Sequence, residues 1–225
     1  MGTRDGLGER RPVPTMQGAM ARWYTRQRGS APQLALVAEQ AAQLSADLPA
    51  GARVLEVVPG PGYLAVELAR LGHEVTGLDL SQSFVDIATR HAQQAGVYVA
   101  FRQGDAADLP FEDESFDLVV CQAAFKNFTR PVDALDQLHR VLRPGGVAVI
   151  QDMRRDAPGA AIRQGVAAMG LGPVNAAMTR LALVTLRLRA LSQAQFERLA
   201  AASAFGSCTT STAGIGIEVR LTRSH

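Results

Sequence analysis

A carboxylate and a glycine-containing loop stand next to each other in the first half of the chain. Residues 54–58 are apolar except for Glu56, and Pro59-Gly60-Pro61-Gly62 follows directly. The two glycines let the backbone approach a ligand closely, and Pro61 fits the first turn of a helix. The pattern Gly60-x-Gly62-x-x-Ala65 also matches the dinucleotide fingerprint. The loop alone therefore indicates a nucleotide-type ligand without identifying it.

A second carboxylate ends the next apolar run. Asp79 closes the segment 74–79, and a carboxylate there can accept hydrogen bonds from both ribose hydroxyls of an adenosine. This contact suits several adenosine cofactors, NAD among them. An Asp that only caps the following helix is the structural alternative.

Two further features separate these ligands. Glu56 lies before the glycines, where it would repel a diphosphate and attract an ammonium group. In the segment 101–110, Asp105 can accept a hydrogen bond from an adenine amino group while the amide of Ala106 donates to a ring nitrogen. These residues together predict a pocket for adenosine joined to an amino acid. S-adenosylmethionine (SAM) is such a ligand.

Apolar runs alternate with helical patterns through the middle of the chain. The expected strands are 53–58, 74–79, 97–103, 116–121 and 147–152, and the expected helices between them are 61–71, 81–95 and 131–142. Ser81 is the expected N-cap of the second helix, and Arg143-Pro144-Gly145-Gly146 is interpreted as a break between helix and strand. Such an alternation is typical of an α/β fold with a parallel sheet covered on both faces, where ligands bind at the carboxyl ends of the strands.

The ends of the chain depart from this alternation. Helical patterns at 16–28 and 31–48 precede the first strand, a helical insert at 157–189 follows the fifth, and a helix at 192–202 precedes two strands at 206–210 and 215–221. The turn at Ala213-Gly214 predicts that these two strands form an antiparallel hairpin. We expect one domain over 1–225, made of a flexible leader (1–15), N-terminal cap helices (16–48), a cofactor-binding core (50–153), a helical lid (154–190), and a C-terminal helix and hairpin (191–225).

Five motifs occur in a recognisable order: LEVVPGPG, VTGLDLS, GDAADLPF, FDLVVCQAAF and LRPGG. With them, residues 50–153 resemble the class I SAM-dependent methyltransferases, in the small-molecule branch (methyltransferase type 11/25-like). The resemblance implies a Rossmann-like three-layer αβα sandwich. Its seven-stranded sheet would be mostly parallel, in the order 3-2-1-4-5-7-6, with an antiparallel C-terminal hairpin and a helical lid. Val58 replaces the first glycine of the family's loop, which leaves open whether the loop keeps its usual shape.

The resemblance also implies which residues hold the cofactor. The set is Tyr24, Glu56, Val58, Pro59, Gly60, Gly62, Asp79, Leu80, Asp105, Ala106, Cys121 and Gln122. In it Leu80 would lie against the adenine, and Cys121 and Gln122 would line the floor near the sulfonium. Tyr24 would close over the methionine end, or alternatively pack in the core.

Lys126 is the only lysine among 23 basic residues, and it follows the fourth expected strand on the substrate side. Many family members carry a histidine there. Lys126 is the candidate catalytic residue, because it could anchor an anionic substrate or act as a base if burial favours its neutral form. A solvated loop lysine is the alternative. Methyl transfer needs mainly an aligned nucleophile, and Lys126 or Asp152 would supply a base for a poor one. His91 is expected to face away from the site.

The segment 154–189 contains six arginines and one acid, Asp156. These arginines either favour an acidic substrate or form a solvated helix face. The chain as a whole has 225 residues, 47% hydrophobic and 20% charged residues, and a net charge of +2. It is typical of a globular protein, and its net charge gives no reason to expect nucleic-acid or membrane-surface binding. Two distant cysteines and no cluster of metal-ligating residues predict no metal.

We expect a cytoplasmic SAM-dependent methyltransferase that acts on O, N or C of a small metabolite, releases S-adenosylhomocysteine, and is a monomer or homodimer. Two alternatives remain. The first is a SAM-binding protein of the same fold that does not methylate. The second is an NAD(P)-dependent oxidoreductase, which is less favoured because of Glu56 and the absence of a Tyr-x-x-x-Lys pair.

Overall fold

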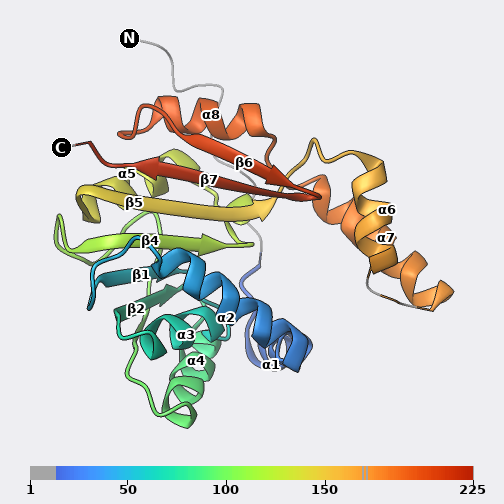
Figure 1. The fold of residues 1–225 in the computed structure, drawn as a ribbon, viewed down its shortest axis with the longest axis horizontal. Helices are drawn as coiled ribbons and strands as arrows, with labels where there is room; N and C mark the ends of the chain where they lie inside the picture. Colours follow the sequence, from blue (N-terminus) through green and yellow to red (C-terminus); the bar gives the residue numbers. More distant parts are fainter. Residues whose placement is uncertain (1–13, 169, 171, 225) are drawn as a thin grey trace.

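The computed structural model describes residues 14–168, 170 and 172–224, and a seven-stranded sheet forms its centre (Figure 1). The strands are β1 (Arg53–Val57), β2 (Glu74–Asp79), β3 (Ala100–Gln103), β4 (Phe116–Gln122), β5 (Leu142–Met153), β6 (Thr209–Ala213) and β7 (Gly216–Thr222). Their order is β3-β2-β1-β4-β5-β7-β6, and β7 is antiparallel to both its neighbours. The Rossmann-like fold, with its antiparallel C-terminal hairpin, is therefore confirmed.

Helices cover both faces of the sheet. The helices α5 (Pro131–Val141) and α8 (Gln193–Ala202) pack on one face, and α2 (Ala31–Ser45), α3 (Tyr63–Arg70) and α4 (Gln82–Gln94) pack on the other. Each face has its own apolar core, to which β1 and β4 both contribute. Because these central strands are buried on both sides, their sequences are nearly continuous apolar runs.

The remaining helices lie toward the carboxyl ends of β1–β5. They are α1 (Gly18–Arg28), the short 3-10 helix η2 (Phe125–Asn127), α6 (Gly159–Ala168) and α7 (Pro173–Arg187). Figure 1 shows the α6–α7 hairpin projecting beyond the sheet on the side toward which β4 and β5 point. Of the expected leader, residues 1–13 lie outside the described part of the chain, whereas Pro14 and Thr15 line a cavity. Within the described residues, no helix combines the length and apolarity needed to cross a membrane.

The first core helix begins later than the sequence predicted. The helix α3 starts at Tyr63 rather than Pro61, and its N-cap Gly62 is left-handed with φ 78°. A residue with positive φ cannot continue a helix, so Pro61 belongs to the loop and not to a first helical turn. The N-cap at Ser81 is confirmed, because its side chain accepts a hydrogen bond from the amide of Phe84.

The predicted change from helix to strand is confirmed, since α5 ends at Val141, but β5 begins at Leu142 and includes Arg143–Gly146, which were expected to precede the strand. Gly145 is left-handed with φ 79°, and two backbone hydrogen bonds hold the segment in place: the amide of Gly145 donates to the carbonyl of Arg223, and the amide of Arg223 donates to the carbonyl of Gly146, each at 2.9 Å. A partner almost eighty residues away in sequence therefore holds this irregular segment at the start of β5. The hairpin strand expected at 206–210 is likewise shifted, to Thr209–Ala213.

Candidate functional site

The loop after β1 has left-handed backbone at three positions. Val58, Gly60 and Gly62 have φ values of 58°, 53° and 78°. At Gly62 a Cβ atom would meet the Cβ of Ala88 at 2.7 Å, so only glycine allows the loop to pack this closely on α4. Val58 takes the left-handed conformation although it is β-branched, which strains the backbone by roughly 1–3 kcal/mol. The loop thus keeps a left-handed residue at this position despite the replaced glycine.

Glu56 is buried in β1 directly beneath this loop. Its side chain lines a cavity of about 250 Å³, and its Oε2 atom has no hydrogen-bond partner. Burial raises the pKa of Glu56 to about 8, with a smaller contribution from nearby Asp79. An unpaired buried carboxyl next to a cavity is costly unless a cationic ligand enters, so this cavity suits an ammonium group.

Asp79 lies at the end of β2 and organises the same loop. Its Oδ2 accepts a hydrogen bond from the amide of Gly60 at 3.1 Å, and its Oδ1 accepts one from the amide of Ser81 at 2.8 Å. Burial raises the pKa of Asp79. The helix cap is Ser81 rather than Asp79, and Asp79 lines a second cavity, of about 380 Å³. The position therefore fits a ligand contact better than the helix-capping alternative.

The two cavities lie on either side of Val58, which lines both. The 380 Å³ cavity, which we call the Asp79 cavity, also contains Leu80, Asp105, Ala106 and residues 127–130. The 250 Å³ cavity, which we call the Glu56 cavity, is also lined by Tyr24 of α1 and by Gln122 at the end of β4. Two adjoining spaces at the carboxyl ends of the strands suit a ligand with two chemically different ends.

Asp105 is less free than the sequence suggested. Its Oδ1 accepts a hydrogen bond from the amide of Ala107 at 2.9 Å, and its Oδ2 pairs with Arg130 Nη2 at 3.0 Å. The carboxylate holds the turn after β3 and remains about two-fifths exposed at the cavity wall. Arg130 was not foreseen, because its place beside Asp105 depends on the path of the chain from β4 to α5.

The neighbours Cys121 and Gln122 face opposite sides of the sheet, as alternate residues of a strand must. Cys121 is buried in the core beneath α5 and α8 and lines neither described cavity, so its place near the cofactor stays a prediction that these cavities do not support. Burial raises the pKa of its thiol, with a smaller contribution from Asp152. Gln122 does line the Glu56 cavity, and its Nε2 donates to Gln151 Oε1 at 2.6 Å.

Tyr24 combines the two roles considered for it. It lines the Glu56 cavity, and its ring packs edge-on against Phe84 with the ring centres 5.9 Å apart. The contact ties α1 to α4 and sets the tyrosine at the edge of the cavity.

Lys126 is neither solvated nor directed into a described cavity. Its side chain is 11% exposed, and its Nζ pairs at 2.8 Å with Asp152 Oδ1, whose side chain is 1% exposed. The amide of Lys126 donates to the other Asp152 oxygen at 3.0 Å, and Nζ also donates to the carbonyl of Ala123. Ala123 has φ 55°. The ion pair therefore holds a strained turn between β4 and η2, and the predicted alternative of a solvated lysine is wrong.

His91 contacts the glycine loop, so the expectation that it faces away from the site is wrong. Its Nδ1 donates to the carbonyl of Pro61 at 2.8 Å, and its ring stacks on Tyr63 at 5.0 Å with an 11° interplanar angle. His91 therefore supports the loop instead of facing away from it. Its spacing of three residues from Ala88, which contacts Gly62, is the signal that could have found it.

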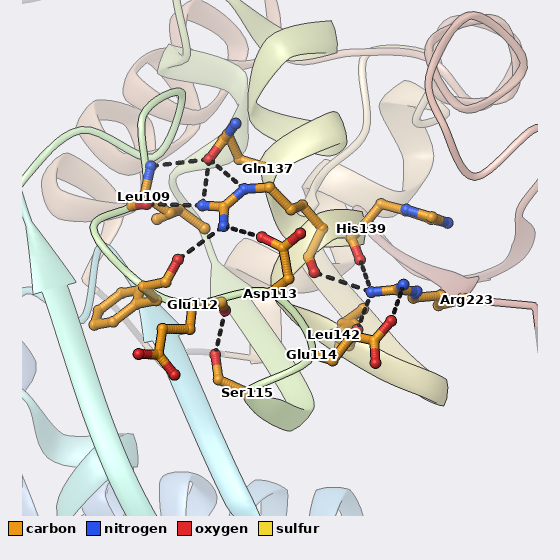
Figure 2. A network of polar contacts seen from close by, with 11 residues as sticks. Leu109, Glu112, Asp113, Glu114, Ser115, Gln137, His139, Leu142 and Arg223 are labelled. Atoms are coloured by element: carbon orange, nitrogen blue, oxygen red, sulfur yellow. Dashed lines mark hydrogen bonds and ion pairs between the residues drawn. The ribbon is translucent and has the colours of Figure 1, made fainter.

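Arg140 and Arg223 connect residues 109–114, which follow Asp105 in the chain, to the rest of the domain (Figure 2). Arg140 of α5 donates to the carbonyls of Leu109 and Phe111, both at 2.8 Å, and pairs with Asp113. Arg223 donates to three carbonyls at the end of α5, including that of Arg140 at 2.9 Å, and pairs with Glu114. These contacts fix the loop that carries Asp105.

Comparisons with known proteins agree with this geometry. A family model described as "Methyltransferase domain" matches residues 55–150. A "Ubiquinone biosynthesis O-methyltransferase" of Roseobacter denitrificans is 34% identical over 106 residues, covering 47% of this chain and 43% of that protein. A "Demethylmenaquinone methyltransferase" of Thermus thermophilus is 41% identical over 100 residues, covering 44% of this chain and 46% of that protein. The chain thus matches about half the length of these curated relatives.

Solved structures share the fold over most of the chain. A SAM-dependent methyltransferase from Aquifex aeolicus has a TM-score of 0.67 at 15% identity, covering 90% of this chain and 98% of its own. A putative S-adenosyl-L-methionine-dependent methyltransferase from Methanococcus maripaludis has a TM-score of 0.71 at 17% identity, covering 97% and 98%. At these identities the likeness concerns the fold.

Proposed function

We propose that this protein transfers a methyl group from SAM to a small-molecule acceptor, a proposal supported by the match of residues 55–150 to the family model described as "Methyltransferase domain". The observation that carries the proposal is Glu56, whose unpaired buried oxygen lines a cavity beside the glycine loop. A cationic amino-acid end would satisfy this oxygen, whereas the diphosphate of NAD would be repelled. No observation favours the non-methylating alternative.

The two cavities fit the two ends of the cofactor. Glu56 would accept from the ammonium group, with Gly60 and Gly62 packed against the methionine portion and Tyr24 over it. Asp79 would accept from the ribose hydroxyls, with Leu80 against the adenine. The turn at Asp105 and Ala106 would meet the adenine edge. The geometry leaves Cys121 out of this set, since it is buried elsewhere.

When bound, the cofactor supplies a methyl group already activated on a sulfonium. The residues of this chain then need to hold the acceptor in line and to exclude water, which can account for much of the rate. Lys126 contributes by fixing the turn at Ala123, which lines the Glu56 cavity, instead of by taking a proton. An acceptor of low acidity would need another base.

The acceptor class is supported by the relatives. Two of them are named for ubiquinone and menaquinone biosynthesis. We therefore propose an aromatic or quinone-type acceptor, methylated at O or C. The parts of this chain that would select it, α1, α2 and the α6–α7 hairpin, lie outside the matched residues 55–150. A cytoplasmic location and a monomeric or homodimeric state stay predictions.

Calorimetric titration with SAM, S-adenosylhomocysteine and NADH tests the cofactor. We expect both sulfur ligands to bind and NADH not to bind. Replacing Asp79 with Ala should weaken binding at least about tenfold, because charge-assisted hydrogen bonds are lost. Asp86→Ala, at an exposed acid of α4, is the control and should bind normally. Binding of NADH alone would contradict the proposal.

A further inference from the structure

One face of α7 leaves apolar side chains in solvent. Val174, Met178 and Leu181, together with Leu188 just after the helix, are 71%, 66%, 68% and 61% exposed. Spacings of four, three and seven residues place them in a single stripe. The helix contacts α6, and none of its residues, all of which the structure describes, is buried. This stripe therefore has no cover within the described part of the chain.

A second set of exposed apolar residues belongs to the N-terminal helices. Met20 and Trp23 of α1 are 56% and 51% exposed, and Leu36 of α2 is 58% exposed. Leu36 also lines the Glu56 cavity. Figure 1 shows α1 and α7 at the same end of the molecule, beyond the carboxyl ends of β4 and β5. We call the α7 stripe together with Met20, Trp23 and Leu36 the apolar rim.

The charge around the apolar rim is mostly positive, although Glu39, three residues after Leu36 on α2, is an exposed acid. Residues 14–38 and 157–196 contain seven arginines and no Asp or Glu, although the chain has 21 acidic residues. The rest of the sequence therefore holds 16 basic and 21 acidic residues. Arg22, Arg26 and Arg180 are among the exposed ones. The net charge of +2 conceals this segregation, so it gave no sign of a cationic surface.

This combination selects one kind of partner. Apolar side chains flanked by arginines, with a tryptophan among them, are the features of helices that lie in a membrane interface. A second copy of this chain would bring one arginine-rich rim against another, and the exposed Glu39 beside Leu36 would offset only part of the repulsion. We propose that the apolar rim docks on a bilayer containing anionic phospholipids, with the two cavities facing it.

Docking of this kind is peripheral and needs no membrane-spanning helix. It goes beyond the proposed function, because vesicle binding does not depend on methyl transfer. If the acceptor is lipid-soluble, docking would let it reach the Glu56 cavity without crossing water.

Vesicle sedimentation tests the proposal on the full chain. The probes are vesicles of dioleoylphosphatidylcholine alone and of an equimolar mixture with dioleoylphosphatidylglycerol. We expect binding to the mixed vesicles at about 0.1 M salt, much weaker binding at about 1 M salt, and little binding to the neutral vesicles. Trp23 is the only tryptophan, so its fluorescence should shift to the blue when the mixed vesicles are added.

Matched variants locate the contact. Met178→Glu combined with Leu181→Glu should weaken vesicle binding at least about tenfold, since charges are placed in the apolar interface. Tyr98→Glu is the control, at an 86% exposed residue just before the edge strand β3. It should not change vesicle binding. Arg180→Ala should weaken binding about fivefold, which corresponds to about 1 kcal/mol, while Arg90→Ala on α4 should not.

Two results would overturn the proposal. One is equal vesicle binding by the α7 variant and by Tyr98→Glu. The other is a stable dimer without vesicles that the α7 variant dissociates, which would make the rim an interface between copies. Calorimetry with S-adenosylhomocysteine on every variant reports folding and the cofactor site separately, so loss of docking is distinguished from failure of the proposed function.

Discussion

Glu56 is buried and also lines the cavity proposed to hold the ammonium group. Without a cation nearby, the pKa of this carboxyl is about 8, against 4.5 for an ordinary glutamate. The folded protein therefore retains a proton that the unfolded chain releases, and its stability falls as pH rises from about 4.5 to about 8. A bound ammonium group reverses this preference by favouring the ionised form.

Glu56→Gln removes this titration. Relative to the wild type, the variant should become more stable as pH rises from 5 to 8, by up to on the order of 4 kcal/mol, because about 1.4 kcal/mol accompanies each pKa unit. Urea unfolding of the ligand-free protein at several pH values measures this. A stability difference that does not change with pH would contradict a raised pKa.

The same residue should make cofactor affinity depend on pH. Binding of S-adenosylhomocysteine should strengthen as pH rises toward 8, by at most about tenfold per pH unit, because the ligand needs the ionised carboxylate. The control ligand is 5′-methylthioadenosine, which has no ammonium group and should show no such trend. Calorimetry with both ligands decides, and equal trends would mean that Glu56 does not contact the ammonium group.

Val58 tests how much strain the loop holds. Val58→Gly should leave stability within about 1 kcal/mol of the wild type, because relief of the left-handed backbone offsets the loss of packing. Val57→Gly is the matched control, because Val57 is a fully buried residue within β1, and it should lose at least about 3 kcal/mol. Similar losses for the two variants in thermal unfolding would argue against strain at Val58.

Among the elements, the junction of β4, η2 and β5 depends on one buried ion pair. Lys126→Met would leave Asp152 buried without its cation, and breaking such a pair typically loses about 3–5 kcal/mol. Lys126→Met with Asp152→Leu should recover part of this loss. Urea unfolding of Lys126→Met, of Asp152→Leu and of the double variant gives the coupling between the two side chains.

Kinetics separates the positioning role of Lys126 from catalysis. If Lys126 only fixes the turn, Lys126→Arg should retain most of kcat and leave its pH profile unchanged, since arginine can keep the ion pair. Loss of one limb of the pH profile in Lys126→Arg would instead show that the amine of Lys126 acts as a general base.

Some of these contacts could be predicted from the sequence and others could not, for physical reasons. Glu56 and Asp79 end neighbouring parallel strands, so their meeting at one edge follows from the fold class. The pairing of Lys126 with Asp152 requires knowing that β5 lies beside β4 in a particular register. The early start of β5 at Leu142 was not predicted, because the pairing of Arg143–Gly146 with Arg223 is not local. The strand order came from the resemblance to a family, not from periodicity.

At the scale of the whole molecule, Arg223 joins the last strand to α5 and to the segment behind the Asp79 cavity. Arg223→Ala would leave carbonyls at the end of α5 without a donor and should destabilise the fold by about 1–3 kcal/mol. Arg220→Ala, at an exposed arginine of β7, should change stability by less than about 0.5 kcal/mol.

Hydrogen exchange shows where the Arg223 variant loosens. Amides of residues 105–115 should exchange faster in Arg223→Ala, because Glu114 loses its ion-pair partner and α5 loses support. If exchange is unchanged in residues 105–115 and faster only in β7, Arg223 does not stabilise the segment that carries Asp105.

The place of β7 between β5 and β6 matters during synthesis of the protein. A ribosome has completed β1–β5, with their helices and most of the cavity residues, before it makes the strand that covers β5. Until residues 216–222 emerge, the nascent chain carries an open edge with unpaired backbone groups along its longest strand, a template for pairing with other chains. Translation that stalls just before this point would therefore leave the sheet with β5 uncovered and prone to aggregate, until β7 pairs with it.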